Sequence, residues 1–140
     1  MKNCIRGIEI LKDKEEIKKL NEIIRFLAGK EKKKLGEIEI VLVNDSELLK
    51  INRKFLNHNY YTDVITFVYN RRDIVSGDVY ISIDTVRKNA IKYDVSFILE
   101  LRRVVIHGML HLTGFDDNND EEKRIMREKE DYYLKRMDKL

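Results

Sequence analysis

The sequence contains no proline and only one cysteine, Cys4, among its 140 residues. One cysteine excludes an intrachain disulfide, so we expect no disulfide partner and a reducing compartment. There is also no tract rich in proline or serine, no low-complexity segment and no internal repeat. We therefore expect residues 1–140 to form a single domain, which at this length can bury a core without covalent support.

Long apolar runs are absent as well. No stretch approaches the roughly 20 apolar residues of a membrane span, and the N-terminal residues lack the apolar run of a signal peptide. We therefore expect a cytoplasmic protein with no membrane partner. The sequence also lacks a large excess of charge of either sign. It has 28 Lys and Arg residues and 25 Asp and Glu residues, which gives a net charge of +3. Composition alone therefore does not indicate a nucleic-acid partner, and short basic runs are typical of a solvated face.

The hydrophobic patterning predicts an α/β fold. Apolar residues at helical spacing favour a helix over residues 14–29, after a first strand over residues 3–10. Further strands are expected over residues 38–43, 64–69 and 78–83, the last two joined by a turn over 70–77 and antiparallel. Further helices are expected after Asn44, over 84–92, over 97–112, and after Asn119. The element order implies a small mixed four-stranded sheet packed with about five helices.

Four details of the helices can be read from the sequence. Glu47 and Glu122 each stand three residues after an asparagine, an arrangement typical of a capped helix start. In the helix after Asn44, the inner stripe is expected to carry Leu48, Ile51 and Phe55. In the last helix, the inner face is expected to carry Ile125, Met126, Tyr132, Tyr133 and Met137. The segment 97–112 is apolar nearly all round, as a central buried helix should be.

Histidine is scarce too, with three residues in all, yet two of them stand four positions apart on this predicted central helix. His107 and His111 therefore share one helix face and can bind one ion, although a lone histidine there would be read as a hydrogen-bonded core residue. Gly114 can reverse the chain and bring back an acid, for which we favour Asp117, with Asp116 as the alternative. Three protein ligands leave an open coordination position, which is typical of catalytic zinc sites. The pattern predicts a metal-dependent enzyme.

The spacing also resembles the zinc-protease pattern H-E-x-x-H-x-x-G-x-x-H, with two exceptions. Gly108 replaces the glutamate that acts as general base, and Asp117 replaces the last histidine. Without a carboxylate at position 108 the protease mechanism lacks its proton acceptor, so a zinc metallopeptidase is a less favoured alternative.

Residues 107–117 (HGMLHLTGFDD) resemble the H-G-x-L-H-L-x-G-[YF]-D-H signature of the YbeY-type rRNA maturation endoribonucleases. A second block agrees, since Asn52, Phe55 and residues 62–67 (TDVITF) are similar to that family's N-x-x-[YF] followed by T-D-V-L-S-F. Residues 76–82 (SGDVYIS) resemble its next strand. With the elements between them, these blocks cover most of the chain from about residue 37 to 137.

This resemblance implies a metal-dependent, single-strand-specific endoribonuclease that takes part in 16S rRNA 3′-end maturation, small ribosomal subunit assembly and ribosome quality control. The partners would be single-stranded RNA, including 16S rRNA, and the small subunit. The cofactor would be one zinc ion, and the family's ligand positions fall on His107, His111 and Asp117. No side chain is assigned as nucleophile or general base, and a metal-activated water would supply the attack.

The chain departs from the family pattern at two positions. Asp117 stands where the family has histidine; a carboxylate can bind zinc but favours harder metals, so manganese or another divalent ion is an alternative. Leu56 stands where the family usually has an arginine that engages RNA phosphate, a contact that leucine cannot make. This substitution makes a non-catalytic, metal-stabilised ribosome-assembly factor an alternative function.

Four residues remain as candidates for substrate binding. Arg53, Lys54 and His58 lie in the segment of Leu56 and could replace its missing charge, while Thr66 stands where the family has serine on the strand beside the cleft. Glu100 and Arg103 lie on the same helical stripe as the two histidines. They either support the ligands or form an ordinary ion pair with each other.

Overall fold

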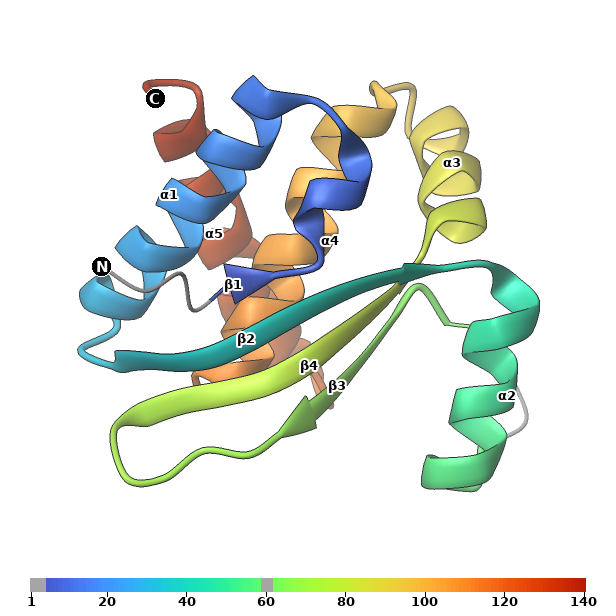
Figure 1. The fold of residues 1–140 in the computed structure, drawn as a ribbon, viewed down its shortest axis with the longest axis horizontal. Coiled ribbons are helices and arrows are strands. Elements are labelled where there is room, and N and C mark those ends of the chain that lie inside the picture. The colour runs from blue at the N-terminus through green and yellow to red at the C-terminus, as the bar shows by residue number, and fades with distance from the viewer. Residues whose placement is uncertain (1–4, 59–61) are drawn as a thin grey trace.

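The computed structural model describes residues 5–58 and 62–140 (Figure 1). Cys4 and the first residues of the predicted first strand lie outside the described residues, as do residues 59–61. The elements follow in the order β1 (Ile5–Arg6), a 3-10 helix (Ile8–Leu11), α1 (Lys14–Lys30), β2 (Lys34–Val43), α2 (Asp45–Leu56), β3 (Val64–Val68), β4 (Ile74–Ser82), α3 (Ile83–Lys92), α4 (Phe97–Leu112) and α5 (Asp120–Met137).

The four strands form one mixed sheet in the order β1-β2-β4-β3. β1 and β2 are parallel, β2 and β4 are parallel, and β3 runs antiparallel to β4. The predicted four-stranded mixed sheet, the antiparallel pair and the five α-helices are therefore confirmed.

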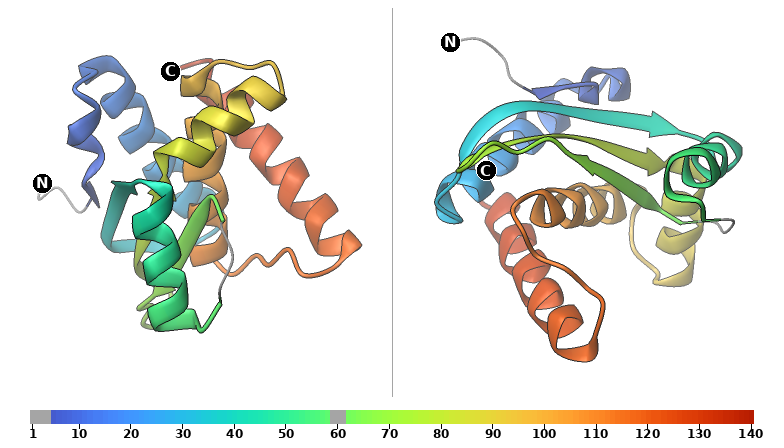
Figure 2. Two further views of the ribbon diagram at one scale, coloured as in Figure 1. Left: turned by 90° about the vertical axis from the view of Figure 1, so that its right-hand side faces the viewer. Right: turned by 90° about the horizontal axis from the view of Figure 1, so that it is seen from below.

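The apolar helix α4 lies between the sheet and α5, as Figure 2 shows. Val75, Val79 and Ile81 alternate along β4 and are buried in the core. The approach of α4 to this strand is so close that a Cβ at Gly108 would lie 2.6 Å from Cγ1 of Val79. Glycine at position 108 therefore lets the helix that carries both histidines lie directly on the sheet.

The helix starts agree with the sequence signals. The Asn44 side chain accepts a hydrogen bond of 2.8 Å from the backbone N–H of Glu47, and the Asn119 side chain accepts one of 2.8 Å from that of Glu122. Both asparagines have extended backbone conformation, as N-cap residues do.

The first strand is shorter than predicted. It ends at Arg6, because Gly7 adopts φ +96° and the chain continues as a 3-10 helix rather than as a strand. β2 and β4 are longer than predicted at their beginnings, where Lys34 pairs with Ile74. The predicted start of the strand over residues 38–43 and the predicted turn over 70–77 are wrong to this extent, since backbone pairing continues beyond the apolar run that marked each strand.

The predicted inner faces of two helices are partly wrong. Leu48 is buried, but Phe55 is 60% exposed, and its ring packs edge-on against Phe67 with centroids 5.8 Å apart. Figure 1 shows the reason, because α2 projects past the end of the sheet. In α5, Met126, Tyr133 and Met137 are buried, whereas Ile125 is half-buried and Tyr132 is exposed. No helix in residues 5–58 or 62–140 is both long and apolar enough to cross a membrane.

Candidate metal centre

The structure brings His107, His111 and Asp117 together. The Nε2 atoms of the two histidines are 2.9 Å apart, and the Asp117 carboxylate oxygens lie 3.4 Å from Nε2 of His107 and 3.7 Å from Nε2 of His111. Within the described part of the chain, these are the three side chains whose ligand atoms could hold one metal ion. Asp116, the alternative acid, is not in this group.

The geometry fits a small divalent cation. Nitrogen and oxygen ligands lie about 2.0–2.2 Å from zinc, so neighbouring ligand atoms of a tetrahedral site are about 3.4 Å apart. The three separations of 2.9, 3.4 and 3.7 Å bracket this value. Three ligands of this kind, all half-buried, leave room for a fourth ligand from the solvent or a substrate.

The chain reverses after α4 as the glycine predicted. Gly114 adopts φ +109°, a left-handed conformation that other residues rarely take. The N–H of Phe115 donates to the carbonyl of Leu110 at 3.0 Å, and the N–H of Gly114 donates to that of His111 at 3.1 Å. This turn closes the C-terminal end of α4 and returns the acidic segment to the face of the helix that carries the histidines.

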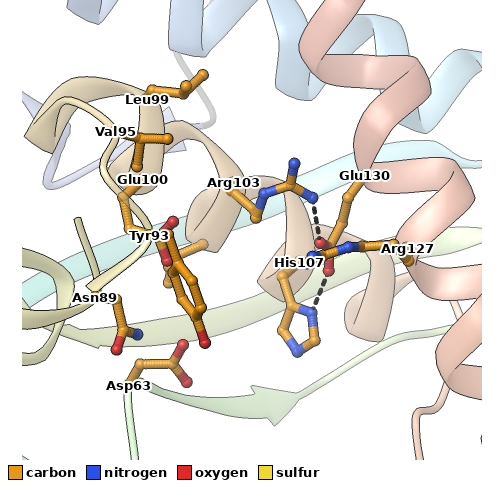
Figure 3. Close-up of a pocket in the computed structure, with 11 residues that line it drawn as sticks. Asp63, Asn89, Tyr93, Val95, Leu99, Glu100, Arg103, His107, Arg127 and Glu130 are labelled. Atoms are coloured by element: carbon orange, nitrogen blue, oxygen red, sulfur yellow. Dashed lines mark hydrogen bonds and ion pairs between the residues drawn. The ribbon is translucent and has the colours of Figure 1, made fainter. Parts of the chain in front are cut away.

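A fourth residue, Glu130 on α5, supports the centre and was not found from the sequence. Its Oε2 lies 2.6 Å from Nδ1 of His107, and its Oε1 accepts a hydrogen bond of 2.9 Å from Nη1 of Arg103 (Figure 3). Glu130 is 5% exposed. Because a carboxylate accepts here, Nδ1 of His107 carries the proton and Nε2 presents its lone pair to the other ligands, an orientation typical of metal-binding histidines.

The pKa shifts follow from this arrangement. Burial alone would raise the pKa of Glu130, but the hydrogen bonds from His107 and Arg103 lower it below its usual value. Burial alone would lower the pKa of His107, but Glu130 raises it. Burial and the neighbouring His107 lower the pKa of His111, which favours the neutral imidazole that binds metals.

A cavity of about 400 Å³ opens beside the three residues. Two of the predicted substrate-binding residues, His58 and Thr66, line it together with Leu56. Arg53 and Lys54 do not line it, and the ammonium of Lys54 lies 5.3 Å from the ring centroid of Phe55 instead. A role of these two residues in substrate binding stays a prediction.

Arg103 does not form the predicted ion pair with Glu100. Its guanidinium bonds to Glu130 and, at 2.9 Å, to Asp131, both on α5. The side chain therefore connects α4 to α5 and acts on His107 through Glu130. Glu100 is buried, and burial raises its pKa.

A model of the family described as Endoribonuclease YbeY matches residues 3–138 of the chain. The chain belongs to the YbeY endoribonuclease family. Endoribonuclease YbeY of Bacteroides thetaiotaomicron is 45% identical over 113 residues, which cover 81% of this chain and 82% of that protein. The protein of the same name from Chlorobaculum tepidum is 45% identical over 118 residues, or 84% and 86% of the two chains.

The fold is also similar to a solved structure. The solution structure of TM1509 from Thermotoga maritima superposes with a TM-score of 0.67 and is 31% identical, covering 95% of this chain and 87% of that one. The resemblance stated from the sequence blocks is therefore confirmed for the family and for the fold. The matched residues 3–138 include the three residues of the candidate metal centre.

Proposed function

We propose that this member of the YbeY family is a metal-dependent endoribonuclease that cleaves single-stranded RNA. The observation that carries the proposal is the convergence of His107, His111 and Asp117 beside an open cavity. The family match over residues 3–138 supports RNA as the substrate and the whole chain as one hydrolase domain.

The finer assignments follow from the same resemblance. The substrate would be the 3′ region of 16S rRNA in the small ribosomal subunit, with a role in subunit assembly and quality control. The cation would be zinc, because two imidazoles dominate the ligand set, with manganese as the alternative that the carboxylate of Asp117 allows. The cytoplasm is the compartment in which such a substrate occurs.

The residues at the metal centre have different roles. His107, His111 and Asp117 would hold a divalent cation, which supplies Lewis acidity and positive charge to a phosphodiester during cleavage. Glu130 keeps the proton of His107 on Nδ1 and so keeps Nε2 free. Thr66 and His58 line the cavity, and their side chains can form hydrogen bonds with a bound RNA strand. No lysine or arginine occurs among the described residues of this wall, which is consistent with leucine at position 56.

A cleavage assay tests the proposal. Zinc-loaded protein should cut a single-stranded RNA of the 16S 3′ end but not a duplex of the same sequence, and a chelator should abolish cleavage. Asp117→Ala should reduce cleavage at least 100-fold because it removes a ligand. Asp116→Ala, at the neighbouring acid, is the matched control and should cleave normally. Cleavage that resists chelation, or equal loss in the two variants, would contradict the proposal.

A non-catalytic assembly factor is the second candidate, and Leu56 on the cavity wall is the observation that favours it. In that case purified protein would not cleave RNA but would sediment with small ribosomal subunits. The peptidase alternative finds no support, because residue 108 faces Val79 of the sheet and a glutamate there would not fit. Casein should therefore stay intact in the same assay.

A further inference from the structure

A second cavity, of about 380 Å³, lies on the other side of His107. Asp63 and His107 line this cavity and also the one beside the metal centre, so the two are neighbours across a shared wall. Its volume lies in the range of small-molecule pockets, about 300–1,000 Å³. Apart from Glu130 and its partner Arg103, the proposed cleavage reaction uses none of the other residues that line it.

An aromatic ring and an amide occupy one wall of this second cavity. Tyr93, at the end of α3, is 57% exposed, and in Figure 3 its ring points toward Asp63 with Asn89 beside it. The ammonium of Lys92 lies 5.4 Å from the centroid of the Tyr93 ring. An exposed tyrosine ring in a cavity offers a flat face on which a nucleobase can stack.

Carboxyl groups line the floor. Asp63 and Glu100 both face the cavity, and burial raises the pKa of each. Together with Glu130 they disfavour a phosphate at this depth, whereas they can accept hydrogen bonds from the amino groups of a base. They do not form a second metal site, because among the described residues only His107, His111 and Asp117 gather their ligand atoms around one point.

A positive charge stands on the opposite wall. Arg127 projects from α5 and is exposed, and Figure 3 shows it reaching in beside Glu130 and His107. Three groups in this cavity suit three features of a nucleotide. The ring of Tyr93 suits the face of the base, the acceptors of Asp63 and Glu100 suit its edge, and the guanidinium of Arg127 suits the phosphate.

We propose that this second cavity is a subsite for one nucleotide next to the scissile phosphate, and that it holds a base with an exocyclic amino group. The inference rests on the proposed RNA cleavage at the adjacent centre. A strand bound across His107 would place one nucleotide at the metal centre and its neighbour against Tyr93. Adenine, guanine and cytosine carry an exocyclic amino group, which can donate a hydrogen bond to these carboxylates. Uracil carries no such group.

Steady-state kinetics of the zinc-loaded full chain test the subsite. With a single-stranded RNA as the probe, Tyr93→Ala should raise KM about tenfold and leave kcat nearly unchanged, since the lost stacking is made in ground and transition states alike. Tyr93→Phe, which keeps the ring, should behave as the wild type. Tyr132→Ala is the matched control, because Tyr132 is an exposed tyrosine outside the cavity.

A second variant reaches the same cavity from another helix. Arg127→Ala should raise KM and reduce its salt dependence, whereas Lys123→Ala, one turn earlier on α5, should do neither. RNAs with one base removed at successive positions locate the subsite. Removal of the base beside the cleaved bond should raise KM for the wild type and raise it less for Tyr93→Ala, whose stacking is already lost. Replacement of that base by uracil removes the amino group that Asp63 and Glu100 bond and should raise KM for both proteins.

The outcomes separate the two proposals. If the wild type cleaves RNA while Tyr93→Ala and Arg127→Ala keep KM within twofold of it, the subsite is overturned and the proposed function stands. The subsite is also overturned if base removal costs Tyr93→Ala as much as the wild type. If the zinc-loaded wild type neither binds nor cleaves single-stranded RNA, both proposals fail together.

Discussion

Two neighbouring arginines on α4 hold two buried glutamates in different ways. Arg102 donates to both oxygens of Glu16 on α1, from Nε at 2.8 Å and from Nη2 at 2.6 Å. Arg103 donates to only one oxygen of Glu130 on α5, and the other oxygen is bonded to His107. Both glutamates are almost fully buried. The first pair therefore joins two helices, while the second also orients a side chain of the metal centre.

The difference shows how one kind of contact serves two purposes. A bidentate pair such as Arg102–Glu16 uses both oxygens of its carboxylate in the contact between α1 and α4. Glu130 divides its two oxygens, so its position determines both the packing of α5 and the tautomer of His107. We therefore expect damage to the first pair to affect stability alone, and damage to the second to affect metal binding.

The largest effect is expected from Arg102→Met. This variant leaves Glu16 buried without its cation, and the free energy of unfolding should fall by about 3 kcal/mol. Urea denaturation measures it. The double variant Glu16→Leu/Arg102→Met removes both charges and should recover most of the loss. A double variant as unstable as the single one would mean that packing of the arginine stem, and not the charge pair, stabilises this contact.

Glu130→Gln should weaken metal binding by about 10- to 100-fold, because glutamine cannot accept from both His107 and Arg103 as a carboxylate does. Competition with a zinc-chelating dye measures the affinity. Glu16→Gln is the matched control and should bind zinc like the wild type. Equal affinities in the two variants would show that Glu130 does not position His107.

The smallest effect is expected at Asp45, whose cluster is nearer the surface. Burial alone would raise its pKa, but hydrogen bonds from Ser82 and Thr85 and the charge of Lys88 lower it to about 2 from an ordinary 3.8. Because the folded pKa is the lower one, the stabilisation is complete above pH 3.8 and is lost as the pH falls toward 2. Asp45→Asn should cost about 1–2 kcal/mol at neutral pH.

Denaturation at several pH values tests this cluster. The difference between Asp45→Asn and the wild type should narrow as the pH falls below about 4. A difference that stays constant from pH 7 to pH 3 would show that the shape of the side chain, and not its charge, stabilises the contact between α2 and α3.

The sequence was sufficient for the parts of the site that depend on local geometry. His107 and His111 are four residues apart on one helix, so their meeting needs only a regular α4. Gly114 is required by the left-handed turn, and that turn brings Asp117 back within three residues. Which of the two adjacent acids faces the histidines depends on exact turn geometry, and only the structure distinguishes Asp117 from Asp116.

The parts that were missed depend on contacts between distant segments. Glu130 meets His107 only because α5 packs along α4, which no local pattern dictates. A signal was nevertheless present, since Glu130 interrupts the buried stripe of Met126, Tyr133 and Met137, and a charge there needs a buried partner. Phe55 was misplaced for a similar reason: its helical spacing was regular, but its ring contacts Phe67 of β3 edge-on and stays 60% exposed.

The central claim is that His107, His111 and Asp117 bind one metal ion. Elemental analysis of the purified chain, equilibrated with zinc and freed of excess, tests it most directly. The account predicts one zinc per wild-type chain and one per Asp116→Ala chain, but a small fraction of this in His111→Ala and Asp117→Ala. A wild-type chain that retains no zinc, manganese or other divalent ion would contradict the account, as would unchanged metal content in the two ligand variants.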